Sequence, residues 1–181
     1  TMTVGDFRWI AEQSRHRCNQ FALGGRGDPD QHEHFEELLQ ICKANDLVPN
    51  FTTSGYGMTP AIAKVCKKYC GAVAVSWYRS EYTVKAIQML LDAGVRTNIH
   101  YVLGNNSIDE AIERLEEDTF PDGINAVIFL LHKPAGHGTK ANVLAFDDPR
   151  VKEFFNQIDR RHPYKAGMDS CNVPGAIHYT S

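Results

Sequence analysis

Helix and strand signals alternate along this 181-residue chain at intervals of roughly 25 residues. The strand signals are short apolar runs, and several are continuous rather than alternating, as is typical of strands covered on both faces of a parallel sheet. We therefore expect repeated βαβ units and an α/β fold. The runs span residues 19–23, 48–52, 72–77, 97–103 and 126–131, with 164–168 as a weaker sixth candidate.

The segments between these runs carry apolar residues at helical spacing, and each begins at a residue that favours a helix N-terminus. In two of them a glutamate stands three residues after the cap, which predicts a capping box. In two others a proline follows the cap, where its fixed φ suits the first helical turn. The expected caps are Asp30, Thr59, Ser80, Ser107 and Asp148.

The first helix signal, residues 7–14, has no strand signal before it. The series therefore looks like a βα array that lacks its first strand, and we expect the chain to be a piece of a longer polypeptide. No low-complexity segment and no linker to a second domain interrupts the series, so residues 1–181 are expected to form a single domain. Residues 163–181 are a candidate start of a C-terminal extension.

The bulk properties exclude several partners. The net charge is −3, whereas a protein that binds mainly nucleic acid needs an excess of Lys and Arg. No apolar stretch approaches the roughly 20 residues that cross a bilayer, and no signal peptide is visible. The five cysteines include no Cys-x-x-Cys pair and form no disulfide framework. These features predict a cytoplasmic protein with no nucleic-acid or membrane partner.

Polar, small and glycine-rich residues follow the apolar runs, at the points where a parallel sheet binds its ligands. Gly24, Gly25 and Gly27 let the main chain approach a ligand closely. Helix capping explains any one of these ends, but their succession favours a site for a polar ligand. The ends are residues 24–28, 52–55, 76–79, 104–106 and 132–138.

The order of these segments resembles the radical S-adenosylmethionine (radical SAM) superfamily, in the middle and later parts of its partial (β/α) barrel. "LGGRGDPDQHEHFEELLQICKAND" is similar to the family's Gly-Gly-Glu stretch, which a proline and an amphipathic helix follow. "FTTSGYG" is similar to its Thr-Asn-Gly turn, and "GAVAVSWY" to a strand with a serine near its end. "TVKAIQMLLDAGVRTNIHYVLG" and "FLLHKPAGHGT" continue the likeness, which covers most of residues 18–138.

This resemblance implies an incomplete (β/α) barrel with a curved, mainly parallel sheet of five to six strands and outer helices. It also implies S-adenosylmethionine (AdoMet) as the cofactor. Gly24 and Gly25 would hold its methionyl amino group through the main chain, and Ser54 and Ser76 its carboxylate or ribose. For the serines, helix capping is the competing interpretation. The remaining candidates, on one face of one strand, are Asn98 and His100.

The sequence departs from the family in three places. Arg26 stands where the family has its glutamate, and Ser54 where it has its asparagine. The Cys-x-x-x-Cys-x-x-Cys motif, whose thiolates hold a four-iron, four-sulfur (4Fe-4S) cluster, is absent from the chain. "CKKYC" has the first spacing, but Val73 stands at the third position and Cys66 lies on the apolar stripe of a helix. Cys18, Cys42 and Cys66 are therefore expected to be packing residues, and Cys171 is the candidate for an additional cluster.

By resemblance, the parent protein reductively cleaves AdoMet to a 5′-deoxyadenosyl radical, as an activating or maturation enzyme. Its 4Fe-4S ligands would lie outside this chain, which alone would be inactive. The implied partners are the missing N-terminal part of its own polypeptide and a protein, peptide or small-molecule substrate.

Three other functions remain open. Gly136 and Gly138 would suit another (β/α)-barrel enzyme or a phosphate-binding domain. A non-catalytic scaffold module that kept the barrel is a second alternative. The tripeptide Arg26-Gly27-Asp28 matches the sequence that integrins read, but without a secretion signal adhesion is disfavoured.

Overall fold

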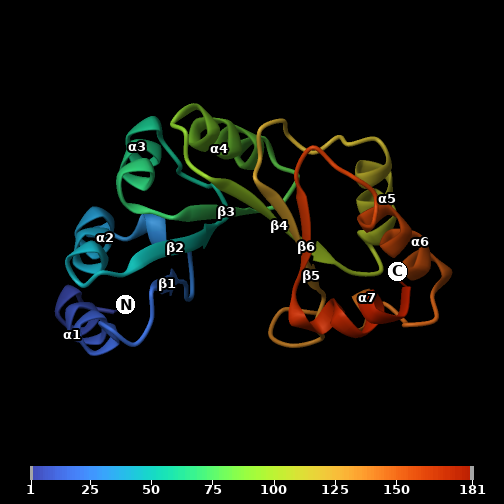
Figure 1. Ribbon diagram of the computed structural model, residues 1–181, viewed down its shortest axis with the longest axis horizontal. Helices are drawn as coiled ribbons and strands as arrows, with labels where there is room; N and C mark the ends of the chain where they lie inside the picture. The colour runs from blue at the N-terminus through green and yellow to red at the C-terminus, as the bar shows by residue number, and fades with distance from the viewer. Residues whose placement is uncertain (1, 180–181) are drawn as a thin grey trace. The chain divides into compact units, whose positions relative to one another are not determined.

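The computed structural model describes residues 2–179, and its six strands form one sheet in the order β1-β2-β3-β4-β5-β6 (Figure 1). β1 pairs with β2, β2 with β3, and β5 with β6, all in parallel. The predicted α/β class, with the strand order of an incomplete (β/α) barrel, is confirmed. The strands are β1 (Gln20–Leu23), β2 (Val48–Thr53), β3 (Ala72–Ser76), β4 (Thr97–Leu103), β5 (Ala126–Leu131) and β6 (Lys165–Met168).

In the described part of the chain, seven α-helices and three short 3-10 helices alternate with the strands. The predicted caps Thr59, Ser80 and Asp148 are confirmed, because their side chains accept hydrogen bonds from backbone N–H groups of the first helical turn. The α-helices are α1 (Val4–Ser14), α2 (Phe35–Ala44), α3 (Pro60–Tyr69), α4 (Glu81–Asp92), α5 (Ile108–Glu116), α6 (Pro149–Ile158) and α7 (Val173–Tyr179). The 3-10 helices are η1 (Pro29–Gln31), η2 (Lys140–Asn142) and η3 (Ser170–Asn172).

The two predicted capping boxes are wrong. Asp30 is buried inside η1, and α2 begins only at Phe35. Ser107 stands at the N-cap position of α5, but its hydroxyl donates to the carbonyl of Val102 at 2.8 Å and accepts from the N–H of Gly104 at 2.9 Å. The Ser107 hydroxyl therefore bonds the backbone at the end of β4 rather than the first turn of its own helix, and Asp30 lies in η1 rather than at the start of α2.

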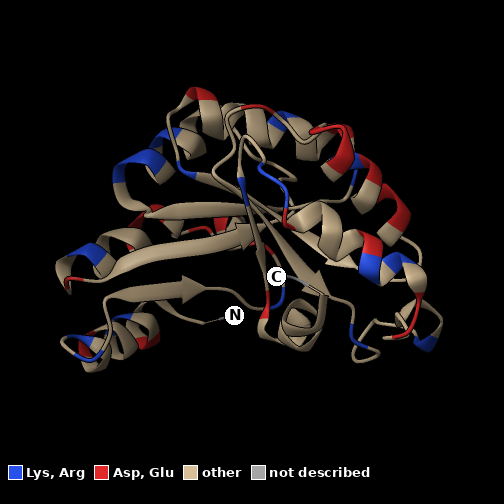
Figure 2. Ribbon diagram, turned by 45° about the vertical axis from the view of Figure 1, so that its right-hand side comes forward, with Lys and Arg blue, Asp and Glu red and all other residues tan. Residues whose placement is uncertain are grey.

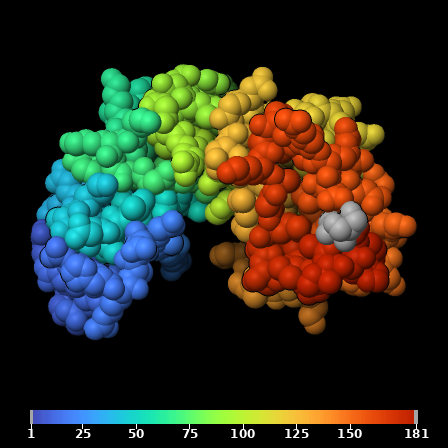
Figure 3. All heavy atoms as spheres, viewed as in Figure 1, coloured from blue at the N-terminus to red at the C-terminus, as the bar shows by residue number. Residues whose placement is uncertain are grey.

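The chain divides into two compact units, residues 1–98 and 99–181. In the first, α1 and α2 lie side by side (Figure 3) and cover β1 and β2. Phe7 of α1 packs edge-on against Phe21 of β1, with ring centroids 5.8 Å apart. Phe35 of α2 packs in the same way against Phe51 of β2, at 5.3 Å. The helical spacing of the apolar residues thus forms the core of this unit.

The second unit has an aromatic core. The Phe129 ring of β5 packs against the Phe154 ring of α6, with centroids 4.9 Å apart, and against Tyr101 of β4. α7, which the sequence analysis did not predict, packs closely on α6. A Cβ added at Gly175 would lie 2.6 Å from the Phe155 ring, so only glycine allows this approach.

Most charged residues lie on the helices and loops of each unit (Figure 2), and Lys165 lies in β6. β1 to β5 contain no Lys, Arg, Asp or Glu, as expected of strands beneath a helical layer. Within residues 2–179, no helix combines the length and the apolar character that crossing a membrane requires.

Candidate cofactor site

A glycine loop, residues 24–27, follows β1 and is exposed to solvent. A Cβ built at Gly24, Gly25 or Gly27 would meet no atom of the described residues within 4 Å, so the main chain there faces open space. Gly27 has a φ of 107°, which side chains other than glycine rarely adopt. The glycine loop therefore presents a bare main chain at the carboxyl end of β1.

Ser54 and Ser76 lie at the carboxyl ends of the next two strands. Along β2 burial alternates, so that Thr53 is buried while Thr52 is partly exposed on the opposite face. Thr53 pairs with Val75 of β3, and each serine directly follows one of these paired residues. The two serines are therefore level with each other on neighbouring parallel strands.

Asn98 and His100 share one face of β4. Burial alternates along this strand, with Ile99 buried between the two partly exposed residues. The N–H of Val73 in β3 donates to the carbonyl of Arg96 at 3.0 Å, which places the start of β4 beside β3. Asn98 thus lies in the first unit with the glycine loop and both serines, whereas His100 belongs to the second.

Burial lowers the pKa of His100 below its usual value of 6.5. Because taking an imidazolium out of water disfavours the charged form, this side chain is neutral at pH 7. A neutral imidazole on the partly exposed face of β4 can accept one hydrogen bond and donate another.

Asp28 connects the glycine loop to β2. The backbone N–H of Ser54 donates to Asp28 Oδ1 at 2.9 Å, and the Ser54 hydroxyl donates to Asp28 Oδ2. The Asp28 carboxylate caps no helix in the described part of the chain. Its partner stands 26 residues away, so no local pattern could have found this contact.

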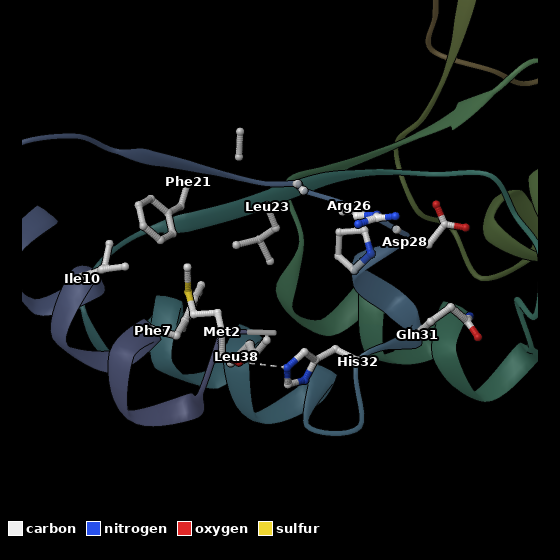
Figure 4. A pocket seen from close by; sticks show the side chains of 15 residues that line it. Met2, Phe7, Ile10, Phe21, Leu23, Arg26, Asp28, Gln31, His32 and Leu38 are labelled. Carbon is white, nitrogen blue, oxygen red and sulfur yellow. Dashed lines mark hydrogen bonds between the residues drawn. The ribbon is translucent and has the colours of Figure 1, made fainter. Parts of the chain in front are cut away.

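A cavity of about 700 Å³ lies between β1, α1 and α2 (Figure 4). Phe21 and Leu23 point into it from β1, and the glycine loop closes one end. Its size suits a small-molecule site, for which about 300–1,000 Å³ is usual. Of the predicted site residues among 2–179, only Gly24 and Gly25 line it. The cavity lies on the helix side of β1.

The five cysteines do not fit an iron-sulfur cluster. No group of three or more His, Cys, Asp or Glu within residues 2–179 could hold a metal ion. Cys42 and Cys66 are fully buried, as predicted, and burial raises the pKa of Cys42 to about 12. Cluster ligands are thiolates, which this environment disfavours. Cys18 was expected to be a packing residue, but it is exposed, as is Cys171.

No protein-family model and no curated protein matches the sequence. Solved structures do match its fold. The structure of Streptococcus suis SuiB bound to precursor peptide SuiA is 15% identical, has a TM-score of 0.73, and matches over 98% of this chain and 44% of SuiB. Native anSMEcpe with bound AdoMet and Cp18Cys peptide is 16% identical, with a TM-score of 0.69 over 87% of this chain and 51% of that protein.

The chain therefore spans about half the length of these proteins. Both are radical SAM enzymes, and the likeness extends over nearly all the described elements. At this identity the likeness concerns the fold: the chain has the partial-barrel fold of the radical SAM enzymes.

Proposed function

We propose that this chain forms the AdoMet-binding part of a radical SAM enzyme that modifies a peptide. The observation that carries the proposal is the glycine loop, whose bare main chain faces open space at the carboxyl end of β1. It stands at a strand end of a fold shared with proteins whose structures contain AdoMet. When bound, AdoMet supplies the 5′-deoxyadenosyl group that becomes the radical in such enzymes.

In this proposal the main chain at Gly24 and Gly25 binds the methionyl amino group. Ser76 and Asn98, on adjoining strands, donate hydrogen bonds to the carboxylate and ribose. The Ser54 hydroxyl donates its hydrogen bond to Asp28 and accepts one from Tyr56. Ser54 can therefore offer the cofactor only its remaining lone pair as an acceptor. His100 lies in the second unit and is not part of this proposed site.

The thiols of this chain do not fit the 4Fe-4S cluster that radical SAM enzymes use, so the proposal places its ligands in another part of the polypeptide. The 181 residues alone would then be inactive. The proposed location of the enzyme is the cytoplasm. A peptide is the proposed substrate class because SuiB and anSMEcpe each have a structure with a bound peptide.

Equilibrium dialysis of AdoMet against the chain tests the proposal. We expect saturable binding at one site per chain, weakened at least about tenfold in Gly25→Val, because the valine side chain occupies the space in front of the main chain. Gly5→Ala, which adds a methyl group in ordinary contact 3.8 Å from Thr3 Oγ1, is the matched control and should bind normally. Wild-type chain that binds no AdoMet would contradict the proposal.

A further inference from the structure

The glycine loop has little to hold it in place through its own side chains. Gly24, Gly25 and Gly27 have none, and Arg26 is exposed. A segment rich in glycine has high conformational entropy when free, so a fixed loop requires an anchor at its end.

Asp28 directly follows the glycine loop, and both its carboxylate oxygens accept hydrogen bonds from Ser54. Oδ1 accepts from the backbone N–H at 2.9 Å, and Oδ2 accepts from the hydroxyl. Hydrogen bonds to an ionised carboxylate are about twice as strong as neutral ones, and two on one residue also fix the orientation. The contact therefore fixes both the position and the direction of the loop end.

Ser54 is itself held firmly. Its Oγ accepts from the N–H of Tyr56 at 3.1 Å, and its carbonyl accepts from the Thr83 hydroxyl at 3.3 Å. Thr83 is fully buried in α4, where its hydroxyl also lies 2.8 Å from that of Ser80. A continuous line of hydrogen bonds thus runs from the loop after β1, across the end of β2, to the first turn of α4.

We propose that Asp28 is a positioning residue, which holds the glycine loop against the carboxyl end of β2 through Ser54. Ser54 then affects cofactor binding mainly by holding the loop in position, and less by touching the cofactor itself. The holding of the loop stands on the contacts alone. The effect on AdoMet rests on the proposed function.

Trypsin cleavage of the Arg26–Gly27 bond tests the holding of the loop. Ser54→Ala removes the hydrogen bond from the hydroxyl, and Asp28→Ala removes both hydrogen bonds between the two residues. The double variant carries both substitutions. Rates are measured by mass spectrometry of the 1–26 fragment. Each cleavage rate is divided by the cleavage rate of a synthetic peptide of residues 21–31 that has the same residue at position 28. This division removes the direct effect of the substitution on how well trypsin cleaves the bond. Thr59→Ala, which loses the cap bond of α3 to Ile62, controls for a general loss of stability.

We expect Asp28→Ala to raise the corrected cleavage rate at least about tenfold and Ser54→Ala to raise it less. The double variant should match Asp28→Ala, because the two residues act as one contact. Unchanged rates, additive effects in the double variant, or an equal rise in Thr59→Ala would each overturn the proposal. If Asp28→Ala does not fold, Asp28→Asn, which keeps the shape but not the charge, replaces it and should give a smaller rise.

AdoMet dialysis with the same variants tests the link to the cofactor. If wild-type chain binds AdoMet, Asp28→Ala should weaken binding several-fold, and unchanged binding overturns the positioning role. If wild-type chain binds none, the proposed function fails, whereas the holding of the loop is still decided by the cleavage rates.

Discussion

Nδ1 of His162 lies 2.7 Å from Oδ1 of Asp118, and the His162 side chain is 2% exposed. Its Nε2 lies 2.8 Å from the carbonyl oxygen of Gln157, and its ring stacks on that of Tyr164 with centroids 5.4 Å apart. One buried ring thus joins the segment before β5, the end of α6 and the start of β6. It stabilises the second unit through packing and hydrogen bonds together.

Replacing this ring tests its role. His162→Ala removes two hydrogen bonds and a buried ring, and we expect it to lower the free energy of unfolding by about 2–4 kcal/mol. Chemical denaturation measures the loss. His137→Ala removes an exposed imidazole and is the control, with an expected effect within about 0.5 kcal/mol. Equal effects of the two substitutions would contradict the structural role.

Asp30 gives the first unit a pH dependence. It is 5% exposed, its Oδ1 has no hydrogen-bond partner among residues 2–179, and burial raises its pKa above the usual 3.8. The fold therefore favours the neutral carboxyl. This contribution is fully present below pH 3.8, and it is lost as pH rises through the raised pKa of the folded state.

Asp30→Asn keeps the shape without the charge. We expect the difference in unfolding free energy, Asp30→Asn minus wild type, to increase as pH rises from 3.8 through the folded-state pKa of Asp30. Thermal unfolding between acid and neutral pH measures this difference. Asp46→Asn, which removes an exposed carboxylate paired with Arg15, is the control for loss of a surface charge. A constant difference between Asp30→Asn and wild type would show that Asp30 is not desolvated.

Arg150 joins the starts of α5 and α6. Its guanidinium binds both carboxylate oxygens of Asp148, at 3.0 and 2.7 Å, and Asp109 Oδ2 at 3.0 Å. We expect Arg150→Ala to destabilise the second unit by about 1–2 kcal/mol, with little rescue by Arg150→Lys, since an ammonium cannot form the paired contact. Denaturation curves measure both. Full stability of Arg150→Lys would show that charge alone suffices.

The cysteines should differ in reactivity. Cys18 and Cys171 are exposed, whereas Cys42 and Cys66 are fully buried and have raised pKa values. Iodoacetamide reacts with thiolates, so we expect it to label the exposed pair in the native chain and the buried pair only after unfolding. Mass spectrometry of the labelled peptides measures this. Native labelling of Cys66 would contradict its placement on the covered face of α3.

The strands and most helices could be predicted from the sequence because each is set by a local pattern. The apolar runs at residues 97–103 and 126–131 coincide with β4 and β5, and Thr59 and Asp148 cap the expected helices. α7 was missed because a Pro-Gly pair follows its first residue. Its packing on α6 outweighs this low helix propensity.

The candidate site was predictable only in outline. Sequence alone places Gly24, Ser54 and Ser76 at strand ends, and parallel pairing brings those ends together. The Asp28–Ser54 contact and the burial of Asp30 depend on how two loops meet in space. No spacing within either loop encodes them.

NMR amide chemical shifts during an AdoMet titration decide whether the cofactor binds at the glycine loop, because they report which residues the ligand touches. We expect shifts at Gly24, Gly25, Ser76 and Asn98, with little change in the second unit around Cys171. Shifts confined to other residues, or none at saturating AdoMet, would rule out binding at the glycine loop.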